Sequence, residues 1–201
     1  MLDPSNMFPE SFHPVVIDKS KDFRRKAKRY SRTRRPTRYL LIDFGLSRRY
    51  DPANGPPLDL PVRGGDKSAP EHQDRVNRCN PFPTDVYYLG NLVREDFMQV
   101  CALFSPSDTP ADRSLQKYQG FEFMEPLVRD MVQTDPTKRP TMDEVATRFS
   151  EIRGKLSTWK LRSRIARRYE FWPVTVWKSV GHWRRTVGYV LGRKAAIPEP
   201  K

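Results

Sequence analysis

The side chains that could do chemistry in this chain are mainly carboxylates, because its thiols and imidazoles are few and scattered. Cys79 and Cys101 do not form a Cys-x-x-Cys pair, and the three histidines stand far apart. A structural zinc ion needs clustered Cys and His ligands, so the sequence predicts no structural metal site. Among the carboxylates, the candidate for a direct chemical role is Asp43 in the tripeptide Asp-Phe-Gly. This tripeptide recurs by chance in protein sequences, so the assignment needs support from the residues around it.

The residues around Asp43 predict the elements that would position it. The run from Tyr39 to Ile42 is short, apolar and rich in β-formers, which predicts a buried strand ending at Asp43. Residues 46–70 are rich in Gly and Pro and show no helical period, so we expect a loop there.

Helices are expected after this loop. Residues 85–97 (DVYYLGNLVREDF) and 121–133 (FEFMEPLVRDMVQ) carry apolar residues at helical spacing. Thr141 and Glu144 have the spacing of a capping box, which predicts a further helix running towards Leu156.

Four motifs occur in a fixed order: Asp-Phe-Gly at 43–45, Ala-Pro-Glu at 69–71, TDVYYLG at 84–90 and DPTKRPT at 135–141. Their order and intervals resemble the C-lobe of eukaryotic protein kinases. The resemblance covers residues 1–156 and implies a mainly α fold, α+β by lineage, with a short β-hairpin at its start. The segment LIDFGLSRRYDP and the Trp-rich tail look like a fungal kinase-like group.

The resemblance gives the Asp-Phe-Gly residues roles at the nucleotide. Asp43 matches the aspartate that holds the metal bridging the ATP phosphates, and carboxylate oxygens suit Mg²⁺. Phe44 matches the hydrophobic residue whose packing sets the active or inactive pose. Gly45 matches the residue that gives the turn its backbone freedom. ATP and Mg²⁺ are therefore the cofactors expected for an intact domain.

Three further matches are structural. Glu71 matches the acid that forms an ion pair with the arginine at Arg139. Asp85 matches the helix aspartate that anchors the backbone of the catalytic loop. The resemblance thus implies scaffolding roles for Glu71, Asp85 and Arg139.

Other kinase parts have no counterpart in these 201 residues. No Gly-rich loop precedes Asp43, and no N-lobe lysine with its glutamate partner or His-Arg-Asp loop is found. Residues 1–4 (MLDP) resemble the stretch after that loop, so we expect the chain to begin downstream of the catalytic base. Residues 63–68 (RGGDKS) lack the threonine that usually precedes Ala-Pro-Glu in active kinases.

The resemblance therefore implies a truncated protein kinase domain. Its parent activity would be phosphoryl transfer from ATP to Ser or Thr of a protein substrate, and the chain alone is expected to be inactive. The alternative is a non-catalytic, pseudokinase-like interaction module that binds proteins or anionic surfaces.

The net charge of +13 comes from two segments. Residues 19–38 hold 11 Lys or Arg against Asp22 alone, and residues 153–194 hold 12 against Glu170 alone. The rest of the chain has more acidic than basic residues. Such asymmetry suggests an anionic partner, for example a membrane surface, for residues 19–38 and 159–194. Residues 19–38 would otherwise be a solvated loop inserted in the C-lobe.

The tail, residues 157–201, is basic and rich in Trp, and its residues 176–191 have apolar positions at helical spacing. This pattern fits a helix that docks its stripe on the C-lobe, and it also fits a membrane-surface helix. Nucleic acid is the least favoured partner, because no nucleic-acid-binding fold is recognisable.

Residues 100–116 lie between two segments with a helical pattern and share neither pattern. They are interpreted either as a tolerated surface-loop insertion or as a retained intron. Valine codons begin with GT and one glutamine codon is CAG, which are the letters of intron ends.

The N-terminus lacks the apolar run of a secretory signal, and no stretch reaches the length of a membrane span. We therefore expect an intracellular protein, cytoplasmic or nuclear, without a transmembrane segment.

Overall fold

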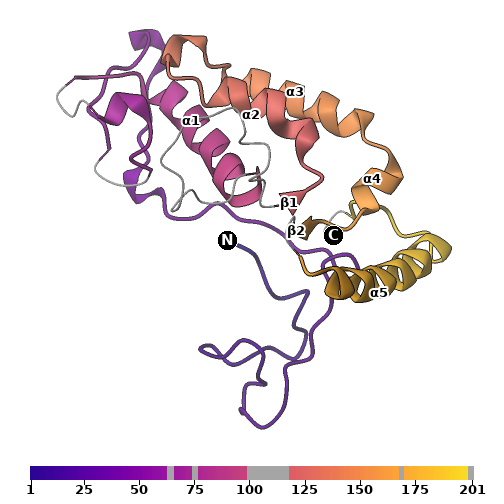
Figure 1. The fold of residues 1–201 in the computed structure, drawn as a ribbon. Coiled ribbons are helices and arrows are strands. Elements are labelled where there is room, and N and C mark those ends of the chain that lie inside the picture. The colour runs from indigo at the N-terminus through magenta and orange to yellow at the C-terminus, as the bar shows by residue number, and fades with distance from the viewer. Residues whose placement is uncertain (63–65, 74–76, 99–117, 168–169, 199–201) are drawn as a thin grey trace. The chain divides into compact units, whose positions relative to one another are not determined.

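The computed structural model describes residues 1–62, 66–73, 77–98, 118–167 and 170–198. The chain divides into two compact units (Figure 1). The terminal unit comprises Met1–Ser47 and Gly181–Lys201, and the central unit comprises Arg48–Val180. Within the described residues no helix is long and apolar enough to cross a membrane.

Helices dominate the described residues, which confirms the mainly α expectation. They are α1 (Pro81–Val93), α2 (Glu125–Met131), α3 (Met142–Lys155), α4 (Thr158–Arg162) and α5 (Trp172–Leu191). A π-helical turn, Arg94–Met98, continues α1, and a 3-10 turn, Glu122–Met124, leads into α2. The two strands, β1 (Tyr118–Gln119) and β2 (Ala166–Arg167), pair antiparallel with Tyr118 opposite Arg167.

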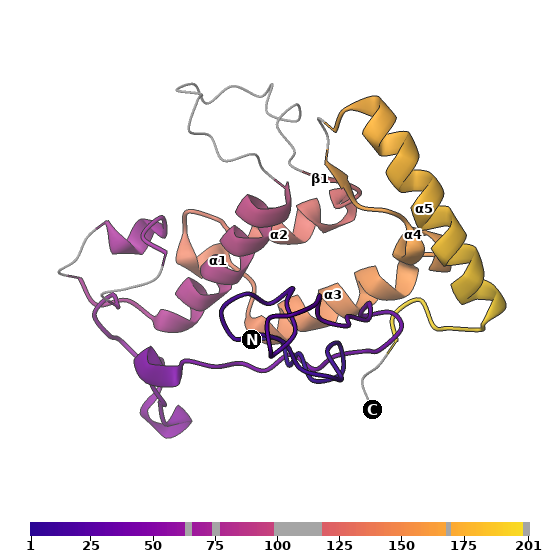
Figure 2. The ribbon, with the colours of Figure 1, turned by 90° about the horizontal axis from the view of Figure 1, so that it is seen from below.

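The core of the central unit lies where α1, α2 and α3 meet (Figure 2). Its buried members come from all three helices: Val86, Leu127, Met131 and Val145. Gly90 allows the closest approach, because a Cβ added there would lie 2.7 Å from the Cβ of Met131 and 2.9 Å from Cγ1 of Val132. The glycine of the TDVYYLG motif is therefore explained by helix packing.

Local capping chemistry fixes the starts of these helices. The side chain of Asn80 accepts a hydrogen bond from the amide of Phe82, so α1 begins at Pro81, four residues before the predicted start. The predicted capping box of α3 is confirmed. Thr141 Oγ1 accepts from the Glu144 amide at 3.3 Å, and the Glu144 carboxylate accepts from the Thr141 amide at 2.7 Å.

The predicted buried strand at Tyr39–Ile42 is wrong. These four residues are 51–86% exposed and form no strand. The expected β-hairpin is reduced to a bridge between Leu2 and Tyr39, extended by a bond from the Asp3 amide to the Arg38 carbonyl at 2.9 Å. The physical reason is lack of cover, because Met7 is the one buried hydrophobic residue among those described in the terminal unit.

The two inserted segments have different outcomes. Residues 19–38 contain no helix or strand, as expected of a loop, and Lys19 pairs with Lys26 in an isolated bridge. The proposed loop or retained intron at 100–116 lies outside the described residues.

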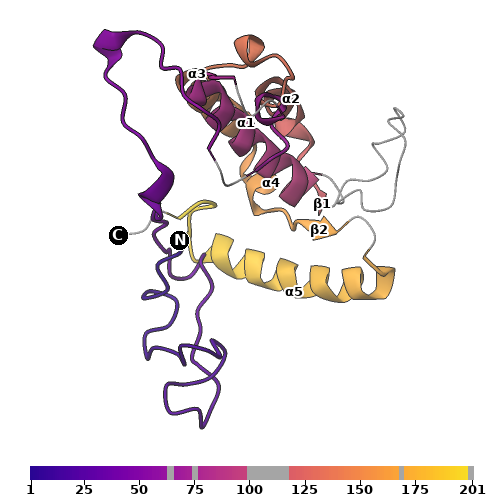
Figure 3. The same cartoon turned by 90° about the vertical axis from the view of Figure 1, so that its left-hand side faces the viewer.

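The helical prediction for the tail is confirmed by α5, which runs without a break (Figure 3).

Candidate functional site

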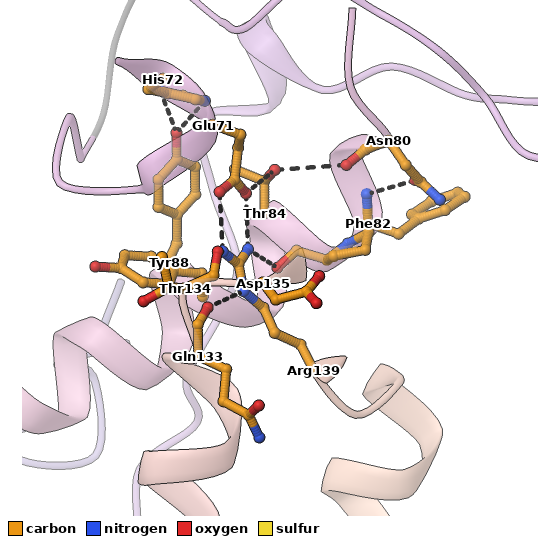
Figure 4. Close-up of polar contacts among 12 residues, drawn as sticks. Glu71, His72, Asn80, Phe82, Thr84, Tyr88, Gln133, Thr134, Asp135 and Arg139 are labelled. Carbon is orange, nitrogen blue, oxygen red and sulfur yellow. Dashed lines mark hydrogen bonds and ion pairs between the residues drawn. The ribbon is translucent and has the colours of Figure 1, made fainter. Parts of the chain in front are cut away.

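The candidate site is a buried ion pair between Glu71 and Arg139 in the central unit (Figure 4). Glu71 lies in the 3-10 turn Pro70–His72, directly after Ala69, which is fully buried. Arg139 follows the turn Pro136–Lys138, which Asp135 caps by accepting a bond from the Thr137 amide at 3.0 Å. The two turns hold side chains that are 68 positions apart in the sequence against each other.

All five N–H donors of the Arg139 guanidinium have acceptors. Nη1 and Nη2 donate to the two carboxylate oxygens of Glu71 at 2.7 and 2.9 Å, which is a bidentate pair. The other three donors reach backbone carbonyls, those of Pro83 at 3.0 Å, Gln133 at 2.7 Å and Thr134 at 3.4 Å. One side chain therefore ties the Glu71 turn to the start of α1 and to the segment after α2.

The pair is desolvated and fully compensated. The Arg139 side chain is 0% exposed and that of Glu71 is 7% exposed. The guanidinium carbon lies 4.8 Å from the centre of the Tyr87 ring, so the cation also gains from the π face. Burial alone would raise the pKa of Glu71, but hydrogen bonds from Arg139 and from Thr84 Oγ1, at 2.6 Å, outweigh it. The pKa of Glu71 falls to about 2.

Two polar contacts surround this pair. Tyr88 Oη lies 3.1 Å from Nδ1 and 3.0 Å from Nε2 of His72, with the two rings edge to face. Burial, together with the nearby negative charges of Asp66 and Glu71, raises the pKa of Tyr88 to about 12. On the next turn of α1, the buried Asn91 donates to Ser68 Oγ at 3.0 Å. The segment before Glu71 is therefore also bound to α1.

The anchoring role expected of Asp85 depends on a catalytic loop that these 201 residues do not contain. Asp85 lies near the start of α1 as an exposed residue, and within the described residues no hydrogen bond or ion pair is found for its carboxylate. Partial desolvation by the protein atoms around it raises its pKa. An acid that anchors a catalytic loop would accept hydrogen bonds from that loop, so this role stays a prediction.

The Asp-Phe-Gly residues lie in the terminal unit. Asp43, Phe44 and Gly45 are all exposed, and Phe44 is 63% exposed. The backbone of Asp43 is left-handed, with φ of 64°. No cluster of three His, Cys, Asp or Glu side chains suited to a metal ion occurs among the residues described. The role expected of Asp43 at ATP-bound Mg²⁺ in an intact domain therefore stays a prediction.

Sequence reasoning identified both members of the ion pair and missed the groups that surround them. Thr84 stands inside the recognised motif TDVYYLG, yet its bond to Glu71 is a consequence of the fold. The carbonyls of Pro83, Gln133 and Thr134 carry no signal in their side chains. The one available signal was their position in the sequence, since Pro83 precedes the motif at 84–90 and Gln133 and Thr134 precede the motif at 135–141.

Comparisons with protein-family models, with curated proteins and with solved structures found no match for this chain.

Proposed function

We propose that this chain is the C-lobe scaffold of a protein kinase domain whose parent activity is phosphoryl transfer from ATP–Mg²⁺ to protein Ser or Thr. The observation that carries the proposal is the bidentate pair of Glu71 and Arg139. It joins the Ala-Pro-Glu motif to the DPTKRPT motif, and both motifs were assigned from their order in the sequence alone.

The proposal gives the buried pair a structural task. In a kinase C-lobe, the segment between Asp-Phe-Gly and Ala-Pro-Glu must end at a fixed point beside the helices. The guanidinium of Arg139 supplies that point here, because it binds Glu71, the backbone at the start of α1 and the backbone just after α2. A charge pair of this kind specifies geometry more than it stabilises the fold.

These 201 residues hold no His-Arg-Asp loop and no Gly-rich phosphate loop. We therefore propose that the chain by itself transfers no phosphate, and that Asp43 acts only when further sequence supplies the base and the ATP lysine.

The experiment is to sequence the transcript upstream of the Met1 codon and to express the longest open reading frame. An in-frame His-Arg-Asp-x-x-x-x-Asn, with phosphoryl transfer that Asp43→Ala abolishes, is the expected result. Activity unchanged by Asp43→Ala would contradict the assignment of Asp43.

The second candidate is a non-catalytic interaction module. It is favoured by the exposure of the apolar residues Tyr39–Ile42 and Phe44, which flank Asp43 in the described part of the terminal unit. In-frame stop codons upstream, with no His-Arg-Asp loop in any transcript, would favour this candidate.

A further inference from the structure

Helix α5 carries an exposed apolar stripe and, next to it, a polar stripe whose members are not exposed. Its apolar stripe consists of residues three or four positions apart that are 43–56% exposed: Val176, Val180, Trp183, Val187 and Val190. The polar stripe has the same spacing, and none of its members is exposed: Thr175, Ser179, His182, Thr186 and Tyr189. A surface helix of a globular protein normally shows the reverse arrangement.

Hydrogen bonds hold the polar stripe against protein in each half of the helix. In the first half, Thr175 Oγ1 donates to Glu170 Oε2 at 3.1 Å. In the second half, the Tyr189 hydroxyl lies 3.0 Å from Ser31 Oγ, and Thr186 is only 8% exposed. With these contacts formed, the apolar stripe stays exposed along α5.

The charged residues within α5 are all basic. No Asp or Glu occurs from Phe171 to Pro198, whereas five basic residues do: Lys178, Arg184, Arg185, Arg193 and Lys194. Glu170, just before the helix, is already engaged by Arg164 and Lys178. Arg184 and Arg185 are exposed and follow Trp183 of the apolar stripe directly.

A second basic segment lies against the C-terminal half of α5 within the terminal unit. Ser31, the partner of Tyr189, belongs to the basic run 19–38. Its neighbours Arg34 and Arg35 are exposed, and the Arg35 guanidinium lies 4.2 Å from the centre of the Tyr30 ring. This stacking leaves the charge of Arg35 on the surface and adds positive charge beside the helix.

We propose that α5 lies in the plane of an anionic lipid bilayer, with the apolar stripe in the boundary between headgroups and acyl chains. Trp is favoured at that depth, and exposed arginines beside it can reach the lipid phosphates. The hydrogen bonds of Thr175 and Tyr189 leave the apolar stripe exposed, so α5 can bind lipid without breaking them. The inference does not depend on the kinase proposal, since it uses only α5 and the segment beside it.

Charge decides between lipid and the other occupants of such a stripe. A second copy of α5 placed face to face would bring Arg184 and Arg185 towards the same charges, which is unfavourable. An anionic headgroup layer complements both the helix and the run 19–38. The lipid surface is therefore the occupant that satisfies the apolar and the basic features together.

The test uses the full chain and sedimentation with vesicles of phosphatidylcholine, with or without a minority of phosphatidylserine. All four Trp of the chain lie between residues 159 and 183, so Trp emission reports on this region. The variant Val180→Asn/Val187→Asn polarises the stripe without removing a buried contact. The matched control is Val15→Asn/Leu41→Asn, at positions that are 82% and 86% exposed and lie off the helix.

We expect binding to phosphatidylserine vesicles with a blue shift of Trp emission, and a measurable part of that binding should persist at about 1 M salt, where charge interactions are screened. The stripe variant should lower vesicle affinity on the order of tenfold, and the control should not. Circular dichroism checks that both variants keep their helicity.

Three results would overturn the proposal. They are no binding to anionic vesicles, binding that high salt abolishes and the stripe variant leaves unchanged, and concentration-dependent dimers that the stripe variant dissociates. The last result would assign the stripe to a second copy of the chain.

Discussion

Replacing Arg139 by Ala should destabilise the central unit more than any replacement of an exposed charge. The change leaves Glu71 buried and unpaired, with its side chain 7% exposed, and it frees the carbonyls of Pro83 and Gln133. Breaking a buried pair in this way costs about 3–5 kcal/mol in the free energy of unfolding. The matched control is Arg148→Ala, whose partner Asp130 lies 2.7 Å away but whose side chain is 38% exposed, and it should cost about 1 kcal/mol or less.

A double-mutant cycle isolates the contact between the two side chains. Urea unfolding followed by circular dichroism gives the free energy of unfolding for the wild type, Glu71→Ala, Arg139→Ala and the double variant. We expect the double variant to lose less than the sum of the two single losses, by about 1–3 kcal/mol. If Arg139→Ala does not fold, Arg139→Lys takes its place in the cycle. Lysine keeps the positive charge but loses the bidentate geometry, so its coupling to Glu71 can still be measured. Strictly additive losses would refute the pairing and with it the scaffold argument.

The remaining predictions concern pH, packing and capping. The pKa of Glu71 is lowered in the folded state from 4.5 to about 2, so its contribution is present above pH 4.5 and lost as the pH falls towards 2. This loss is about 3 kcal/mol, and in Glu71→Gln the free energy of unfolding should lack that acid-dependent part. Gly90→Ala should destabilise by about 1–3 kcal/mol through overpacking against Met131, whereas Gly154→Ala, with open space around it in α3, should stabilise by about 0.5–1 kcal/mol. Equal effects of the two glycine changes in urea melts would contradict the close approach of α1 and α2. Thr141→Ala removes the capping box and should lower the unfolding free energy by about 1 kcal/mol; an unchanged midpoint would count against that cap.

Local chemistry made part of this fold predictable. The capping box of Thr141 and Glu144 needs only residues three positions apart, and the structure forms it as expected. The ion pair of Glu71 and Arg139 was implied by the resemblance of their two motifs to those of a known family, and both turns that carry it begin with a proline after an extended residue.

The errors arose where burial depends on distant segments. A run such as Tyr39–Ile42 has β propensity whether or not another layer of the protein covers it. The described residues of the terminal unit leave this run exposed. The outward stripe of α5 was visible as a pattern, but its direction follows from the bonds of Thr175 and Tyr189.

Under the proposed function, this chain carries kinase-like scaffolding without the residues that transfer phosphate. The most direct test of this claim is transfer of labelled phosphate from ATP–Mg²⁺ to a generic basic protein, measured for the 201-residue chain and for Asp43→Ala. The account predicts that both proteins stay at the background of an enzyme-free control. Transfer by the wild-type chain that disappears in Asp43→Ala would contradict it.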